Sequence, residues 1–133
     1  MVSWQGWPLE RLVTLLSALA FLLLWMQLSL FHWRAHFRER AMWGPVVYTP
    51  LMIIIAAIFT VGRGASLELA YLVIFALGAV EGLIGCTLHL RGSLRLKGGL
   101  NLRNLSVGPP VLLTLLYALL AFQGFLIVVG LRL

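Results

Sequence analysis

Residues 12–31 read LVTLLSALAFLLLWMQLSLF, a run of 20 residues without a charge. An α-helix needs about 20 apolar residues to cross the roughly 30 Å hydrocarbon core of a bilayer, so this run predicts a transmembrane helix. Three further apolar runs follow, at residues 46–61, 67–90 and 107–131. We therefore predict an all-α integral membrane protein, an up-down four-helix bundle with spans at approximately 10–32, 46–61, 67–90 and 108–131.

The composition supports this class independently. Hydrophobic residues make up 62% of the chain and charged residues 11%, which leaves a soluble globule too few polar groups to cover its surface. We expect residues 1–133 to form a single transmembrane domain. We also expect the first run to be retained, because it is longer than the apolar core of a signal peptide and no small-residue cleavage site follows it.

The charged residues are distributed unevenly between the two ends of the predicted bundle. The connections after the first and third runs carry seven cationic residues against one acidic residue: Arg34, Arg38, Arg40, Arg91, Arg95, Lys97 and Arg103 against Glu39. The opposite end carries three cationic residues against two acidic ones. By the positive-inside rule we predict that the basic loops are cytoplasmic and that both termini lie outside, an N-out/C-out orientation, with the bacterial cytoplasmic membrane as the location.

The net charge of +6 would suggest nucleic acid as the partner of a soluble protein. Here the cations border hydrocarbon, so anionic lipid headgroups are the expected partner, and we predict no nucleic acid. The residues that we expect to contact headgroups are Arg91, Arg95, Lys97 and Arg103.

The three histidines are predicted to lie at one membrane depth. His32 and His36 end the first span and His89 ends the third, both on the basic side. Residues four apart share a helix face, so we expect His32 and His36 to point the same way. One interpretation places all three imidazoles in the headgroup region; the other makes them ligands of haem or of a metal ion.

Glycines and one carboxylate occupy the third predicted span beside this position. Gly78, Gly82 and Gly85 fall within about 40° of the direction of His89 at roughly 100° per residue. They indicate either close helix packing, since small residues four apart allow it, or a bare surface for a flat cofactor. Glu81 is the only acidic residue well inside a predicted span. We expect it to be a hydrogen-bonded carboxyl, with Gln27, Gln123 or Tyr117 as partner, or else a proton or ligand site.

If the histidines are ligands, two chemistries compete. Haem b would take His89 with His36 or His32 as its two imidazoles. A metal ion would take His32, His36 and His89 together with Glu39 or Glu81. The His32-x-x-x-His36 spacing resembles one histidine box of the membrane fatty-acid desaturases, but the further boxes that those enzymes need are missing from the sequence. We assign no family on this basis.

These observations predict a non-catalytic integral membrane subunit or anchor of a larger membrane complex, of the electron-transfer kind. We expect other membrane subunits as partners, and a haem b, pigment or metal held near the cytoplasmic rim by the histidines. A redox or metal-dependent membrane enzyme component is one alternative. The other is a small oligomeric transporter that uses Glu81.

Overall fold

The computed structural model describes residues 2–95, 99, 101, 103 and 111–130. Four long helices dominate this part of the chain: α1 (Leu9–Arg34), α2 (Trp43–Val61), α3 (Ala65–Leu94) and α5 (Val111–Gly130). The predicted all-α four-helix arrangement is thus confirmed, and each helix is long and apolar enough to cross a membrane. α2 begins before its predicted start at residue 46, and α3 continues past its predicted end at residue 90. Residue 108, the predicted start of the last span, lies outside the described residues.

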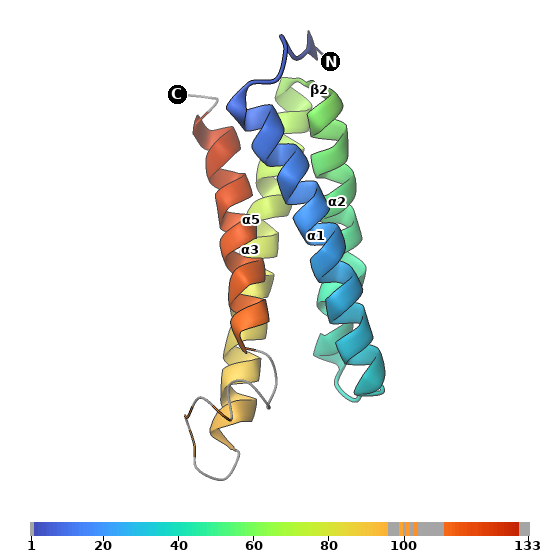
Figure 1. Cartoon of the computed structure of the whole chain (residues 1–133), viewed down its shortest axis with the longest axis vertical. Coiled ribbons are helices and arrows are strands. Elements are labelled where there is room, and N and C mark those ends of the chain that lie inside the picture. Colours follow the sequence, from blue (N-terminus) through green and yellow to red (C-terminus); the bar gives the residue numbers. More distant parts are fainter. Residues whose placement is uncertain (1, 96–98, 100, 102, 104–110, 131–133) are drawn as a thin grey trace.

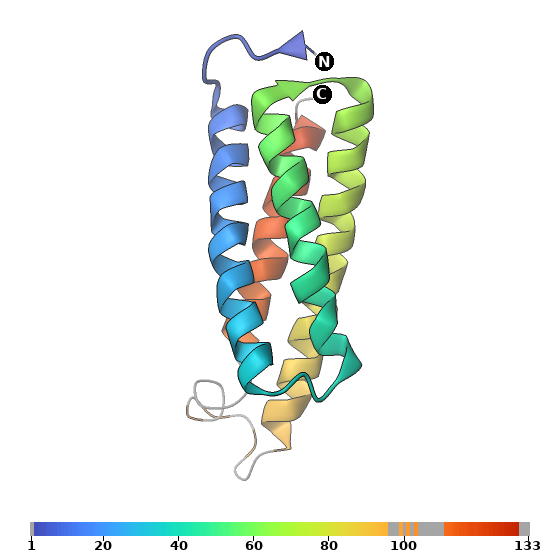
Figure 2. The ribbon, with the colours of Figure 1, turned by 90° about the vertical axis from the view of Figure 1, so that its right-hand side faces the viewer.

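The four helices run alternately up and down in an elongated bundle (Figures 1 and 2). α3 packs most extensively on α5, and α1 on α2, whereas α1 and α5 share a smaller contact. Figure 1 shows the two pairs close together at the end that carries the termini and diverging towards the other end. The connection between α1 and α2 and the C-terminal end of α3 lie at the diverging end (Figures 1 and 2).

Aromatic side chains fill the core between the two pairs. Phe21 of α1 is fully buried and meets Phe75 of α3 edge-on at 5.7 Å and Tyr117 of α5 at 5.2 Å between ring centroids. Tyr71 stacks on Phe75 at 4.0 Å and lies 4.9 Å from Phe59 of α2. Since such pairs stabilise beyond the area that they bury, this cluster joins all four helices.

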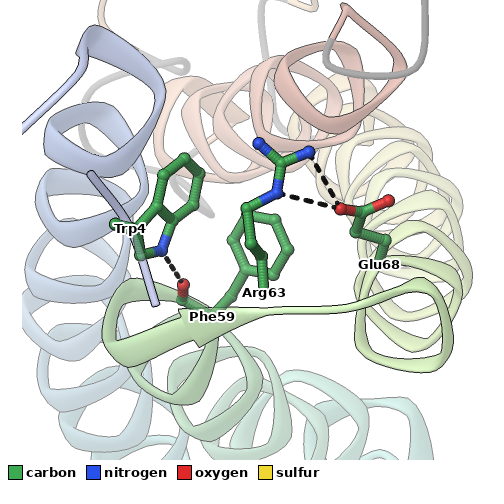
Figure 3. Close-up of polar contacts among 4 residues, drawn as sticks. All are labelled: Trp4, Phe59, Arg63 and Glu68. Atoms are coloured by element: carbon green, nitrogen blue, oxygen red, sulfur yellow. Dashed lines mark hydrogen bonds and ion pairs between the residues drawn. The ribbon is translucent and has the colours of Figure 1, made fainter. Parts of the chain in front are cut away.

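A small sheet, which the sequence did not lead us to expect, fastens the N-terminal segment to the turn between α2 and α3. Strand β1 (Val2–Ser3) pairs antiparallel with β2 (Gly62–Arg63). The Trp4 Nε1–H donates to the Phe59 carbonyl oxygen at 2.8 Å, and the Arg63 guanidinium forms an ion pair with Glu68 at 3.2 Å (Figure 3). Because Arg63 also lies 5.2 Å above the Trp4 ring, the indole is held from two sides.

The connection from α1 to α2 is short and turns sharply. After α1 ends at Arg34, His36 and Phe37 adopt left-handed backbone conformations, with φ of 56° and 47°. The 3₁₀ turn η1 (Arg40–Met42) then leads directly into α2. The Phe37 ring stacks on Trp43 at 4.2 Å between centroids, which packs the turn against the start of α2.

Candidate functional site

A cavity of about 490 Å³ lies at the diverging end of the bundle. Its size falls within the roughly 300–1,000 Å³ that is typical of small-molecule and cofactor sites. Its lining combines apolar residues with a few polar ones from α1, α3, α5 and the connection to α2. The residues that line it are Leu28, His32, Glu39, Ala41, Met42, Pro45, Glu81, Gly82, Ile84, Gly85, Leu88, His89, Arg91, Gly92, Arg95, Thr114 and Tyr117.

Two of the three histidines meet in this cavity. His32 reaches it from the last turn of α1 and His89 from α3, and their ring centroids lie 6.5 Å apart with the planes inclined by 61°. His32 is buried, with 7% of its surface exposed. The Nδ1 atom of each ring is buried and has no hydrogen-bond partner within the part of the chain that the structure describes.

Two serines close in sequence to these histidines also have an unpaired polar atom within the described residues. The hydroxyls of Ser29, one turn before His32, and of Ser93, one turn after His89, are also buried without a partner among the residues described. These two serines and two histidines make up four of the five such side-chain atoms in the described chain. A buried polar group left unpaired costs about 1–3 kcal/mol. Of these four residues, His32 and His89 line the cavity, whereas Ser29 and Ser93 do not.

His36 does not join this pair. α1 ends two residues before it, and its left-handed backbone conformation turns the chain away from the helical direction. The side chain is exposed. The prediction that His32 and His36 share a helix face is therefore wrong. Phe37 instead lies beside the His32 ring, at 6.3 Å between centroids.

Glu81 lies in the same cavity and accepts a hydrogen bond. The Tyr117 O–H donates to its Oε2 at 3.2 Å, and the Thr49 hydroxyl lies 3.1 Å from the Tyr117 oxygen. Of the three candidate partners for this carboxyl, the structure places Tyr117 against it, whereas Gln27 and Gln123 are exposed on the outside of the bundle.

Gly44, at the start of α2, closes against the other carboxylate oxygen. A Cβ built on it would lie 2.7 Å from Oε1 of Glu81. A larger residue at this position would therefore displace the carboxylate.

The three glycines near His89 meet different neighbours. A Cβ on Gly82 would lie 2.8 Å from the backbone of Ala118, and one on Gly78 would lie 2.6 Å from the end of the Met52 side chain. Both glycines therefore allow close packing. At Gly85 the nearest atom would be Thr114 Cγ2 at 3.5 Å, an ordinary contact. Gly82 and Gly85 also line the cavity, and of these two only Gly85 is free of a close contact.

The cationic residues predicted to contact lipid are distributed along and beyond α3. Arg91 and Arg95 line the cavity and are exposed. Arg103 is exposed as well, whereas Lys97 lies outside the described residues. Contact with headgroups stays a prediction for all four.

A metal site of several protein ligands is not assembled here. Among residues 2–95, 99, 101, 103 and 111–130, no group of three or more His, Cys, Asp or Glu side chains is placed to hold a metal ion. The geometry thus brings together His32 and His89, with Glu81 deeper in the same cavity, and leaves His36 outside.

Comparison with known proteins gave no match: no family model fits the sequence, and no curated protein or solved structure is similar to it. Function must accordingly be argued from the cavity and its residues.

The sequence reasoning missed several residues of the site. Leu28 and Thr114 line the cavity without any sequence pattern that marks them, and Gly44 closes against Glu81. Gly44 alone had a usable signal, because it stands between Trp43 and Pro45 at the entry to a helix, where a small residue allows a side chain from another helix to approach.

Proposed function

We propose that this protein is a non-catalytic integral membrane subunit of a larger electron-transfer complex, and that it holds a cofactor in the cavity through His32 and His89. The observation that carries the proposal is the approach of the two imidazoles, 6.5 Å apart, with both Nδ1 atoms unpaired among the described residues. Imidazole is a common ligand of protein-bound metals and of haem iron. Two such groups from different helices would hold a cofactor between the two helix pairs.

The outer surface of the bundle supports placement in a membrane. Many large apolar side chains on several helices are exposed, and the most exposed include Leu23 at 67%, Val47 at 67% and Leu112 at 70%. A soluble monomer rarely exposes continuous apolar surface on this scale. Lipid chains would cover these faces at no cost, and the basic connections would then lie on the cytoplasmic side.

Two exposed amides support association with other subunits. Gln27 on α1 and Gln123 on α5 lie on the outside of otherwise apolar helices. An amide without a hydrogen-bond partner is unfavourable in hydrocarbon. A neighbouring transmembrane helix could supply that partner, as polar side chains do between packed membrane helices.

Orientation can be tested by labelling single cysteines in intact cells. In a Cys86→Ser background, we expect Ser66→Cys to react with an impermeant maleimide from outside and Arg38→Cys to react only after permeabilisation. The opposite pattern would overturn the N-out/C-out orientation. Equal reaction of both from outside would overturn membrane insertion between them.

The cofactor and the complex are tested together by mild-detergent extraction from the native host. We expect a discrete complex that contains this chain, together with a chromophore or metal whose amount falls in His32→Ala and in His89→Ala. His36→Ala is the matched control and should retain the cofactor, because His36 lies outside the cavity. Recovery of a lone protein without chromophore or metal would overturn the proposal.

A further inference from the structure

The separation of the two imidazoles discriminates between metal geometries. Ligand nitrogens lie about 2.0–2.1 Å from a metal, so two imidazoles on opposite sides of one ion have ring centroids roughly 6.4 Å apart. At the tetrahedral angle, the same bonds would bring the centroids to roughly 5.2 Å. The observed separation of His32 and His89 is 6.5 Å. It matches ligands in the two axial positions of an octahedral ion.

The number of available protein ligands leads to the same geometry. A tetrahedral zinc site takes three or four protein ligands, and no such group is assembled within the described ranges. Haem brings four equatorial nitrogens of its own and asks the protein only for axial ligands. A pair of histidines is therefore a sufficient donor set for haem and an insufficient one for a structural zinc ion.

The cavity also has the surroundings that a porphyrin needs. Leu28, Ile84 and Leu88 give it apolar walls, and Gly85 lines it without a side chain. Arg91, in the last turn of α3, and Arg95, directly after the helix, also line the cavity. A cavity with apolar walls and two cationic residues fits a flat, apolar ring that carries carboxylates along one edge.

We infer that the cavity binds haem b, with the iron between the His32 and His89 imidazoles and the propionates directed towards Arg91 and Arg95. This inference rests on the proposed function and specifies its cofactor. The 61° between the ring planes is compatible with it, since each imidazole rotates freely about its bond to the iron.

The first test is a titration of the purified, detergent-solubilised protein with hemin, followed by absorption and electron paramagnetic resonance spectra. We expect saturable binding of one hemin per chain and the low-spin spectrum of iron with two axial imidazoles. His32→Gly and His89→Gly should each lose the low-spin signal, and His36→Ala should keep it. Addition of free imidazole to either glycine variant should restore the signal if the variant is folded, as circular dichroism will show.

The contact with the propionates is tested with a double variant that removes both positive charges. Arg91→Gln and Arg95→Gln together should weaken hemin binding by at least roughly tenfold, because two charge-assisted hydrogen bonds are lost. Arg38→Gln is the matched control, since Arg38 is exposed and does not line the cavity. Equal affinities for the two variants would overturn the assigned orientation of the porphyrin.

Other outcomes separate the inference from the proposed function. Failure of hemin to bind, together with stoichiometric binding of Zn²⁺ or Cu⁺ that requires His32 and His89, would overturn haem but retain the cofactor-holding function. A low-spin signal that survives both glycine variants without added imidazole would overturn the assigned ligands. Failure to bind hemin and both metals would overturn the inference and the proposed function together.

Discussion

Substitution of Gly82 by alanine should push α3 and α5 apart at Ala118. The added Cβ would lie 2.8 Å from the N, Cα and Cβ atoms of Ala118, and backbone cannot rotate away as the end of a side chain can. Overpacking of this kind typically costs about 1–3 kcal/mol. We therefore expect Gly82→Ala to lower the free energy of unfolding by that amount relative to a matched variant without the clash.

Gly85→Ala provides the matched variant. Both glycines lie in the interior of α3, so the gain in helix propensity, up to about 1 kcal/mol for Gly to Ala, is the same for each and cancels in the comparison. The Cβ at residue 85 would be 3.5 Å from Thr114, which is an ordinary contact. Gly78→Ala should fall between the two, because the atoms it meets are the mobile end of Met52.

The assay is SDS-induced unfolding of the protein in bicelles, followed by tryptophan fluorescence. The expected order of stability is Gly85→Ala above Gly78→Ala above Gly82→Ala. If Gly82→Ala is as stable as Gly85→Ala, the close approach of α3 and α5 at Ala118 is wrong, and the packing assigned to this stripe of glycines must be withdrawn.

Three further predictions concern contacts elsewhere in the bundle. Tyr117→Phe removes the hydrogen bond to Glu81 and should cost about 0.5–1.5 kcal/mol; the cost should shrink in a Glu81→Leu background, which has no acceptor at this position, and additive effects would show that the two side chains are not coupled. Trp4→Phe removes a hydrogen bond to an α2 carbonyl, so we expect faster amide exchange of the β1–β2 pair, and unchanged exchange would contradict the contact. Met52→Ala should cost about 2–5 kcal/mol because Met52 is fully buried, whereas Ile54→Ala, 55% exposed, should cost far less in the same SDS assay; equal costs would place Met52 outside the core.

The four helices were predictable because hydropathy alone distinguishes an apolar run of about 20 residues from any soluble pattern. Their exact ends were not. No residue before Arg34 gives a sequence signal for the end of α1. The left-handed conformations of His36 and Phe37 belong to the turn that packs Phe37 on Trp43. The prediction that His32 and His36 share a helix face was wrong for this reason.

The partner of Glu81 shows a second limit of the sequence. Spacing gives the direction of a side chain relative to its own helix, but the rotation of that helix against its neighbours depends on packing. From the sequence, the candidate partners Gln27, Gln123 and Tyr117 were equivalent. In the structure, Tyr117 packs against Phe21 in the aromatic cluster, and this rotation of α5 points its hydroxyl towards Glu81. The topology predicted that a histidine of the first span would lie near His89. It did not predict whether this would be His32 or His36.

The pairing of β1 with β2 has a consequence for biogenesis. Residues 2–3 are synthesised first, yet their partners at residues 62–63 emerge only after two hydrophobic segments have left the ribosome. The strand bonds can form only when the N-terminal segment and the turn between α2 and α3 have reached the same compartment. In the proposed membrane orientation, this pairing is completed only after the first two segments have inserted, and an N-terminal fusion partner retained on the wrong side of the bilayer would prevent it.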